Sequence, residues 1–489
     1  MTDGLKTRSI KGVLWSATES VGVAILSLGS FIILARILEP GDIGAVALAS
    51  AFIIIFNLII AYGFVDAIVL QLRLTPEHLD TGFWSTLGTA ILLCLLCTLG
   101  ADTAAQWLNE PKLAVIMPWL STLLIVNSLG AVPIAIFRRD LRFRTLAICN
   151  VSGRAIGAVA SVIMALTGFG LWSLVGQQLI AAVISSAAVV IAARWRPHFR
   201  FSLQRLREMG EFGFHVSTSQ VISALGEQMM NLLVGSMFGT VILGHFSVAW
   251  RMVQLVRALI ASAVYQVAFS TFAKLQHDRP ALVRAFTRAT KMSCLIGFPI
   301  GAGMAVTAEP AIQVMFGAKW EESIPLFGIL ALDMLPAFYL MFFSAGYRAL
   351  GKPAWALYSA ILYFTIGMTG IVVMSQFFGI AAVAIFWVCK SVSLMPIHIY
   401  VMHRFLGISM PAMLGMATPA LAATAAMAAG VAATLWALPA GYGAPLQLTI
   451  AIGVGVALYI GAARLFAPAL VRDVISTGRI MITPSSSQG

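Results

Sequence analysis

The residues best suited to chemistry in this sequence are charged side chains that interrupt long apolar stretches. Four are basic and four are acidic: Arg154, Arg251, Arg257, Lys390, Glu19, Asp66, Glu227 and Asp333. A charge inside hydrocarbon is costly, so such residues usually face a polar cavity and mark a substrate or ion pathway. Asp66 lies near a span end and is set aside. The other seven are candidates for a pathway through a membrane.

Two of the apolar stretches also carry polar stripes at helical spacing. The stripes comprise Ser16, Glu19, Ser27 and Ser30 in one stretch, and Gln220, Ser223, Glu227 and Asn231 in the other. Hydrogen bonds and ion pairs between neighbouring helices would produce the same pattern. For any single residue, packing is as good an explanation as function. A purely structural role for all the charges is less favoured, because four acids and four bases exceed what packing requires.

The elements that must position these residues are membrane-spanning helices. The chain has 489 residues, of which 60% are hydrophobic and only 10% charged, with a mean hydropathy of +0.93. A helix needs roughly 20 apolar residues to cross a bilayer, and helices satisfy every backbone polar group internally. The fold class is therefore an all-α membrane protein of about fourteen transmembrane helices. The predicted spans are 12–37, 43–69, 83–105, 114–137, 145–167, 170–193, 213–238, 241–273, 289–308, 323–347, 354–378, 380–403, 411–437 and 446–467.

The distribution of positive charge sets the predicted topology. Most of the 31 Lys and Arg residues fall in alternate loops, in clusters such as residues 138–144, 194–207 and 274–291. Cytoplasmic loops carry this excess in membrane proteins, so both termini are expected in the cytoplasm. The first apolar stretch follows Lys6, Arg8 and Lys11 but is too long for a signal peptide, and we interpret it as a retained span.

A weak internal repeat at a separation of 200 residues divides the chain. The segment Ile43–Ala49 resembles Leu243–Ala249, chiefly through Gly44 over Gly244 and Ala49 over Ala249. Each repeat contains six spans, so the two are parallel, and cargo binds between the lobes of such transporters. The expected domains are an N-terminal six-helix lobe (1–200), a C-terminal six-helix lobe (201–405), helices 13 and 14 (406–470) and a cytoplasmic tail (471–489).

The connecting segments carry no sign of catalysis. The loops are short and turn-rich, and no extramembrane domain is expected, which argues against polymerases, ligases and glycosyltransferases. The sequence contains neither a phosphate-binding Gly-Lys-Ser/Thr loop nor a metal-binding cluster of His or carboxylates. We therefore expect no enzyme activity, no cofactor and no metal. The segment from Arg196 to Phe212 alternates aromatic residues with arginine and predicts an interfacial helix.

Several short motifs resemble one family over most of the chain. They are Trp15-Ser16, Ala35 to Gly44, Phe137 to Arg144, Gly168 to Val175, Trp195-Arg196-Pro197, Asn231 to Gly235, Leu243-Gly244, Ala249-Trp250-Arg251 and Phe316 to Trp320. Together they resemble the bacterial Wzx-type polysaccharide flippases of the multidrug/oligosaccharidyl-lipid/polysaccharide exporter superfamily, particularly the branch serving lipopolysaccharide or exopolysaccharide synthesis. The chain departs from the family at Met230, where an acid is common, and at His245-Phe246, where tyrosines are common.

The resemblance implies a cargo, which is an oligosaccharide repeat unit on polyprenyl pyrophosphate that moves between leaflets of the bacterial inner membrane. Our hypothesis for the mechanism is alternating access of two lobes around a cationic cavity, with Arg154, Arg251 and Lys390 binding the head group; of these, only Arg251 is a position carried over from the family. Arginine suits phosphate because its planar fork can bond two oxygens at once. Trp15, Trp250 and Tyr265 could stack on sugars. The acids Glu19, Glu227 and Asp333 would couple transport to protons or Na⁺. Membrane lipids, a polysaccharide polymerase and glycosyltransferases are the expected partners; nucleic acid is not.

Two other functions stay open at this point. A cation-coupled drug exporter of the same superfamily would share the architecture but should have a net acidic cleft, whereas here acids and bases balance. A membrane scaffold for polysaccharide enzymes would not transport at all. Glycosyltransferase genes beside this one would fit a flippase or a scaffold but not a drug exporter.

Overall fold

The computed structural model describes residues 2–61, 68, 74–275, 278–352, 354–377, 379–439 and 441–468, and within these ranges the chain forms helices and connecting loops without a strand. The predicted tail at 471–489 lies outside the described residues. Thirteen helical segments are long and apolar enough to cross a membrane. One of them, Val221–Ile260, has 40 residues, or about 60 Å of helix, twice what a bilayer requires.

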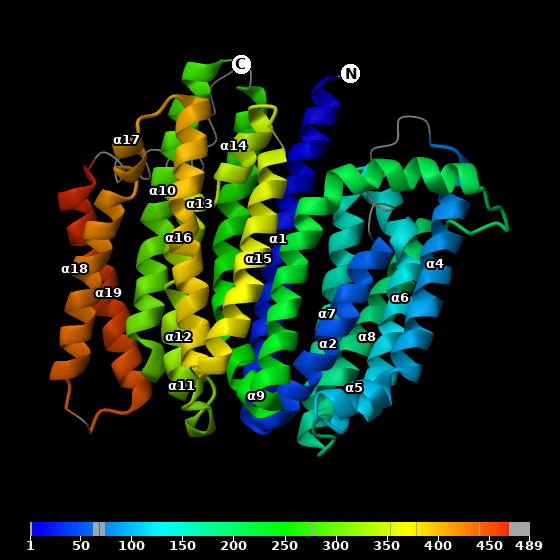
Figure 1. Ribbon diagram of the computed structural model, residues 1–489, viewed down its shortest axis with the longest axis horizontal. Coiled ribbons are helices and arrows are strands. Elements are labelled where there is room, and N and C mark those ends of the chain that lie inside the picture. The colour runs from blue at the N-terminus through cyan, green and yellow to red at the C-terminus, as the bar shows by residue number, and fades with distance from the viewer. Residues whose placement is uncertain are drawn as a thin grey trace. The chain divides into compact units, whose positions relative to one another are not determined.

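That long segment contains a break at the predicted turn. Gly239 leaves the helical conformation, with φ 83° and ψ 172°, a region of backbone space open mainly to glycine. The segment therefore supplies two spans, and the all-helical membrane fold with about fourteen spans is confirmed. Figure 1 shows α9 in green running in both directions through the bundle.

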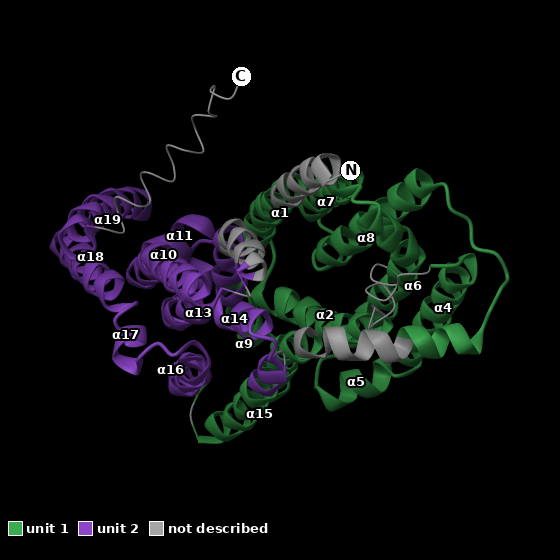
Figure 2. Ribbon diagram, turned by 90° about the horizontal axis from the view of Figure 1, so that it is seen from above, with its two compact units in different colours: residues 1–248, 360–380 green, residues 249–359, 381–489 purple. Residues whose placement is uncertain are grey.

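Packing groups the helices into two compact units (Figure 2), residues 1–248 with 360–380 and residues 249–359 with 381–489. The predicted lobes, 1–200 and 201–405, stay predictions based on the repeat. Helices wholly or mainly in unit 1 are α1 (Thr2–Ile37), α2 (Pro40–Ala61), α4 (Pro76–Leu99), α5 (Ala101–Trp107), α6 (Lys112–Arg139), α7 (Phe143–Leu166), α8 (Trp172–Ala193) and α15 (Ala354–Phe377). Helix α9 (Leu203–Lys274) contributes to both units. Unit 2 adds α10 (Arg279–Val306), α11 (Ala308–Met315), η1 (Ala318–Trp320), α12 (Ser323–Ala331), α13 (Met334–Leu340), α14 (Phe343–Ala349), α16 (Ile380–Leu406), α17 (Met410–Leu414), α18 (Thr418–Ala437) and α19 (Ala444–Phe466).

Small residues bring the backbones of α7 and α8 together within unit 1. A Cβ atom at Gly153 would overlap Ser185 Oγ and lie 2.7 Å from the carbonyl oxygen of Ala181. One turn later, a Cβ at Gly157 would lie 2.8 Å from the carbonyl oxygen of Gln177. Glycines four apart form a flat helix face that allows such an approach, the usual basis of helix association in lipid. This contact fixes α7, which carries Asn150 and Arg154.

The two glycines paired by the predicted repeat, Gly44 and Gly244, lie in contact with each other's turns. A Cβ at Gly44 would overlap the carbonyl oxygen of Thr240, and a Cβ at Gly244 would overlap that of Pro40. The starts of α2 and of the second half of α9 therefore cross at backbone distance, which leaves no room for a side chain.

The turn between α5 and α6 braces both helix starts at this crossing. Lys112 Nζ binds Asp42 Oδ1 at 2.7 Å, which ties it to α2. Glu110 Oε2 accepts a hydrogen bond from the hydroxyl of Thr240, which ties it to α9. The crossing of the two turns is therefore held by backbone packing and by two polar contacts.

The predicted interfacial helix at Arg196–Phe212 is wrong in its first half. The chain after α8 runs non-helically from Arg194 to Ser202, and α9 begins only at Leu203. Arg194 takes a left-handed conformation, φ 52°, that ends α8, and Pro197 restricts the residue before it to extended geometry. We call residues 195–202 the strap.

The strap is fastened to the first turns of α4. The amide of His198 donates to Asp80 Oδ1 at 3.0 Å, and its carbonyl accepts from Trp84 Nε1 at 2.8 Å. The amide of Ser202 donates to the buried hydroxyl of Thr81 at 3.1 Å. Phe199 stacks on Trp84 with ring centroids 4.8 Å apart. The strap is thus bound along its length to α4.

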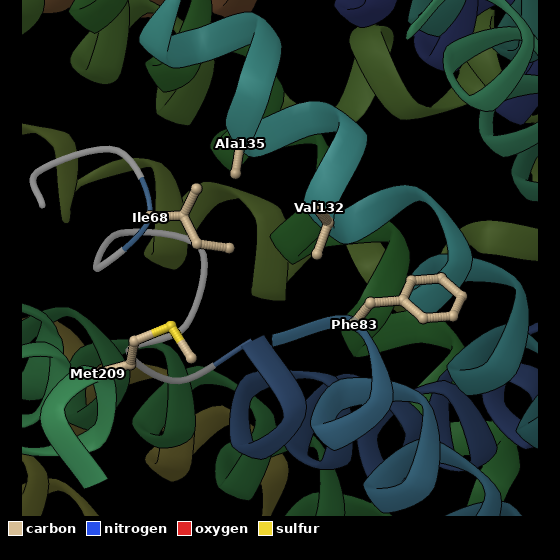
Figure 3. Packing of buried hydrophobic residues seen from close by; sticks show 5 residues of the cluster. All are labelled: Ile68, Phe83, Val132, Ala135 and Met209. Atoms are coloured by element: carbon tan, nitrogen blue, oxygen red, sulfur yellow. The ribbon is translucent and has the colours of Figure 1, made fainter. Parts of the chain in front are cut away.

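The first turns of α9 continue this attachment and run across the ends of α4 and α6 (Figure 1). Met209 packs among Phe83 of α4 and Val132 and Ala135 of α6 (Figure 3). Arg205 donates to Glu208 at 2.9 Å and thereby lowers the pKa of that exposed carboxyl. Met209 is therefore buried against the ends of α4 and α6, whereas Leu203 and Arg207 are exposed.

We predict that Thr81→Val loosens the strap without disturbing the helices. Valine has nearly the shape of threonine but cannot accept the hydrogen bond from the Ser202 amide, and an unsatisfied donor costs about 1–3 kcal/mol. Trypsin should therefore cleave after Arg200 several-fold faster, whereas it does not cut the Arg196–Pro197 bond. Thr167→Val, at an exposed position at the end of α7, is the control and should cleave like the wild type. Equal cleavage of all three proteins would contradict a strap held by this bond.

The predicted span 323–347 is broken in the structure into α12, α13 and α14. The first break, at Leu332 and Asp333, lies directly before a helix that contains Pro336. Proline has no N–H to bond the carbonyl four residues earlier, and its ring clashes with that carbonyl, which here belongs to Leu332. The interruption places Asp333, 5% exposed, between two short helices.

Candidate functional site

A group of polar and aromatic side chains within unit 2 joins three elements. They come from the second half of α9, from the α12–α13 break and from the middle of α16. Its members are Trp250, Arg257, Asp333, Trp387, Lys390 and Ser391. Five of the six have a buried or nearly buried side chain, whereas that of Arg257 is 40% exposed. We call this group the unit 2 site.

One part of the site is a cation held on indole rings. Lys390 Nζ lies 3.3 Å from the ring centroid of Trp387, one helical turn earlier on α16. Trp250 of α9 packs edge-on against Trp387, with centroids 5.6 Å apart and the planes at 87°. A desolvated cation over a tryptophan face gains about 2 kcal/mol or more. Lys390 as a whole is 5% exposed, so its ammonium group lies over the ring within the packed interior.

The other part is a bridged carboxylate. Ser391 Oγ donates to Asp333 Oδ1 at 2.8 Å. Arg257 Nη1 lies 3.8 Å from Asp333 Oδ2 and also 3.5 Å from Gln254 Oε1 of its own helix. The carboxylate therefore uses both oxygens, one toward a neutral hydroxyl and one toward a guanidinium. Because Lys390 and Ser391 are adjacent on α16, the two parts are contiguous.

The structure thus brings together three of the predicted site residues, Trp250, Lys390 and Asp333. Arg251 is also in unit 2, partly buried on α9 beside Trp250. Trp387 and Ser391 were missing from the predicted site, and Arg257 was a charged candidate to which no binding role was assigned. The spacing of Trp387 and Lys390, three residues apart, was the available signal for the first of these. The Arg257–Asp333 pair has no short-range signal, because 75 residues of chain separate its members.

The remaining predicted residues lie in unit 1. Asn150 Nδ2 of α7 donates to Glu19 Oε1 of α1 at 2.6 Å. Arg154, one turn further along α7, is exposed. Glu227 is partly buried in the first half of α9. Glu19, Arg154 and Glu227 are not part of the unit 2 site. The predicted role of Arg154 in head-group binding and those of Glu19 and Glu227 in ion coupling stay predictions.

Trp15 and Tyr265 were the other two aromatic residues predicted to stack on sugars. The ring of Trp15 lies under the guanidinium of Arg144, 5.4 Å from centroid to Cζ, so one of its faces is already used by a cation. The side chain of Tyr265 lies outside the described residues. Across the described part of the chain, no three His, Cys, Asp or Glu side chains gather as metal ligands.

Comparison with protein families gives a match over residues 33–325, more than half of the chain, to the family described as polysaccharide biosynthesis protein. The succinoglycan biosynthesis transport protein ExoT of Rhizobium meliloti is 29% identical over 80% of this chain and 79% of its own length. The lipopolysaccharide biosynthesis protein WzxC of Escherichia coli is 24% identical over 67% of each chain. The teichuronic acid biosynthesis protein TuaB of Bacillus subtilis is 21% identical over 66% of this chain and 67% of its own.

Solved structures share the fold. A lipid II flippase, MurJ, in an inward closed conformation superimposes with a TM-score of 0.78 over 94% of this chain and all of its own, at 15% identity. An inward-facing multidrug transporter of the MATE family superimposes with a TM-score of 0.62 over 80% of this chain and 98% of its own, at 14% identity. At such identities the likeness concerns the fold alone, and it extends to both flippases and drug transporters.

Proposed function

This chain belongs to the polysaccharide biosynthesis protein family, and on that basis we propose that it moves oligosaccharide repeat units linked to polyprenyl pyrophosphate across the bacterial inner membrane. Two relatives that cover two thirds or more of the chain are named for succinoglycan transport and lipopolysaccharide biosynthesis. The chain is a multi-pass membrane protein. Transport would serve lipopolysaccharide or exopolysaccharide assembly, with both termini in the cytoplasm and with polymerase and glycosyltransferases as partners.

The observation that supports this function best is the cation held on tryptophan in the unit 2 site. A pyrophosphate and hydrated sugars cannot cross hydrocarbon unaided, because each polar group would lose its hydration without compensation. Lys390 offers a positive charge in a desolvated place, where it attracts phosphate more strongly than at the surface. Lys390 already covers one face of Trp387, so Trp250 is the better candidate of the two for stacking on a sugar ring.

In this proposal the protein is a transporter without a catalytic step. The head group would bind to Lys390 and to the arginines Arg154 and Arg251 and would become exposed alternately to the two sides of the membrane, while the lipid tail stays in the bilayer. Glu19, Glu227 and Asp333 would couple the cycle to protons or Na⁺. Alternating exposure needs a ligand that binds the two states with different affinity, and a charged head group or a coupling ion provides that difference.

The main alternative is a cation-coupled drug exporter, since the fold is shared with a multidrug transporter. The unit 2 site argues against it, because its single acid, Asp333, already faces Arg257. A cationic drug would meet Lys390 and Arg257 as well as that acid. A scaffold for polysaccharide enzymes is the third possibility, and it would require no binding site within the spans.

The test of this function is the leaflet distribution of lipid-linked oligosaccharide in cells depleted of the protein. We expect the oligosaccharide to accumulate on the cytoplasmic side and the wild-type gene to restore its export. Arg251→Ala, if Arg251 binds the head group as proposed, should restore it poorly at equal abundance. A normal distribution after depletion, in a strain without a second flippase gene, would contradict the proposal and favour the drug exporter.

A further inference from the structure

We propose that Arg257 is a head-group-binding residue whose availability is controlled by Asp333, so that the pyrophosphate and the Asp333 carboxylate compete for one guanidinium. The inference rests on the proposed function and assigns a regulated binding role within the unit 2 site. It differs from the roles given to Lys390 and Arg251, which do not involve an exchange between partners.

The geometry of the pair is that of an exchangeable contact. Arg257 Nη1 and Asp333 Oδ2 are 3.8 Å apart, longer than the 2.7–2.9 Å of a charge-assisted hydrogen bond. The guanidinium is also shared with Gln254 Oε1 at 3.5 Å, again a long contact. A phosphate oxygen that bonded Arg257 directly would gain a shorter and stronger interaction than either partner provides now.

The two partners differ in how firmly they are held. Asp333 has an 8% exposed side chain, lies at a helix break and accepts a hydrogen bond from Ser391 at 2.8 Å. The Arg257 side chain is 40% exposed and has a long flexible stem. The arginine can therefore leave while the carboxylate stays, and the exposed partner is the one with the geometry to bind two phosphate oxygens.

Competition for one cation links the two binding events. When Asp333 is ionised it retains Arg257 and weakens head-group binding; when Asp333 is neutralised, by a proton or by a bound cation, Arg257 is released to the phosphate. Such couplings between sites amount to 5- to 150-fold in affinity, and they are reciprocal. The head group would therefore help to neutralise Asp333, which is the behaviour required of an ion-coupled transporter.

The test is a double-mutant cycle on binding of a short polyprenyl pyrophosphate, farnesyl pyrophosphate, to the purified full-length protein in lipid nanodiscs. We expect D333N to bind this probe about tenfold more tightly than the wild type, and R257Q to bind it about tenfold more weakly. The double variant D333N/R257Q should bind like R257Q. Without the Arg257 guanidinium, the charge of Asp333 no longer affects binding of the pyrophosphate. D102N neutralises an exposed acid of α5 and should leave the affinity unchanged.

Two results would overturn the inference. One is a D333N variant, or the equally neutral D333S if D333N does not fold, that binds the probe no better than the wild type. The other is a gain from D333N that persists in the R257Q background, since this would place the competition elsewhere. If the wild type itself does not bind the probe, the proposed function fails at this site, and that outcome is distinct from a failed cycle in a protein that binds.

Discussion

Gly44→Ala should sharply reduce the amount of folded protein and lower its apparent unfolding temperature in detergent by several degrees. The added Cβ would overlap the carbonyl oxygen of Thr240 and lie 2.9 Å from the amide nitrogen of Gly244. Both obstacles are backbone atoms, which cannot rotate away as a side chain could. Overpacking costs about 1–3 kcal/mol, sometimes more, and a backbone clash belongs at the upper end. Gly244→Ala, which meets the carbonyl of Pro40, should behave alike.

The control for this prediction is another glycine within a helix. Gly88 of α4 has no atom within 4 Å of a built Cβ, and alanine is favoured over glycine in helices by about 1 kcal/mol. Gly88→Ala should therefore unfold at the wild-type temperature or slightly above it, as measured by size-exclusion chromatography after heating. A Gly44→Ala protein as stable as Gly88→Ala would contradict the close crossing of the two turns.

Lys390→Met should reduce transport of the lipid-linked oligosaccharide by about 10- to 150-fold per folded molecule. Methionine fills similar space beside Trp387 but cannot attract phosphate, and a hydrogen bond to a charged group contributes about 1.5–3 kcal/mol. Lys390→Arg keeps the charge and should retain most of the activity. Transport is measured in vesicles and divided by the amount of monodisperse protein, which separates a lost contact from lost folding.

The comparison of the two variants decides the role of the cation. If Lys390→Met transports within a few-fold of the wild type, the ammonium group on Trp387 serves only packing, and the head-group role falls. If both variants fail equally, the position tolerates no change in shape, and charge is not what matters there.

The spans could be predicted from the sequence because each is a long apolar run that ends at turn-forming residues. The turn at Phe238-Gly239-Thr240 was correctly predicted even though the helix continues closely on both sides of Gly239. The breaks within 323–347 could not be found by hydropathy, because a broken span is as apolar as a continuous one. Pro336 was the one feature of the sequence that could have predicted the first break, because its ring clashes with the carbonyl of Leu332, four residues earlier.

The interfacial prediction failed for a similar reason. Aromatic and arginine residues alternate both in the strap and in the helix that follows, so composition places the whole segment at the interface without fixing its conformation. What decides the conformation is a set of hydrogen bonds to Asp80, Thr81 and Trp84, residues more than 100 positions earlier in the chain. Contacts at that separation leave no trace in a local pattern.

For the site, the sequence predicted residue types better than groupings. Charges in apolar spans identified Lys390 and Asp333, and a family motif identified Trp250. The sequence did not reveal that Asp333 faces Arg257 and Ser391, because this depends on how α9, α13 and α16 pack within unit 2. Whether Asp333 contacts an arginine can therefore be learned only from the three-dimensional structure.

The measurement that tests the central claim most directly is translocation by the purified protein in vesicles. Lipid-linked oligosaccharide is incorporated into both leaflets, and a glycosidase added outside reports which molecules are exposed. With the protein present and an ion gradient imposed, we predict that the internally shielded fraction becomes susceptible to the enzyme, whereas protein-free vesicles keep it shielded. A shielded fraction that stays constant with correctly folded protein, under a proton or a Na⁺ gradient of either direction, would contradict the account.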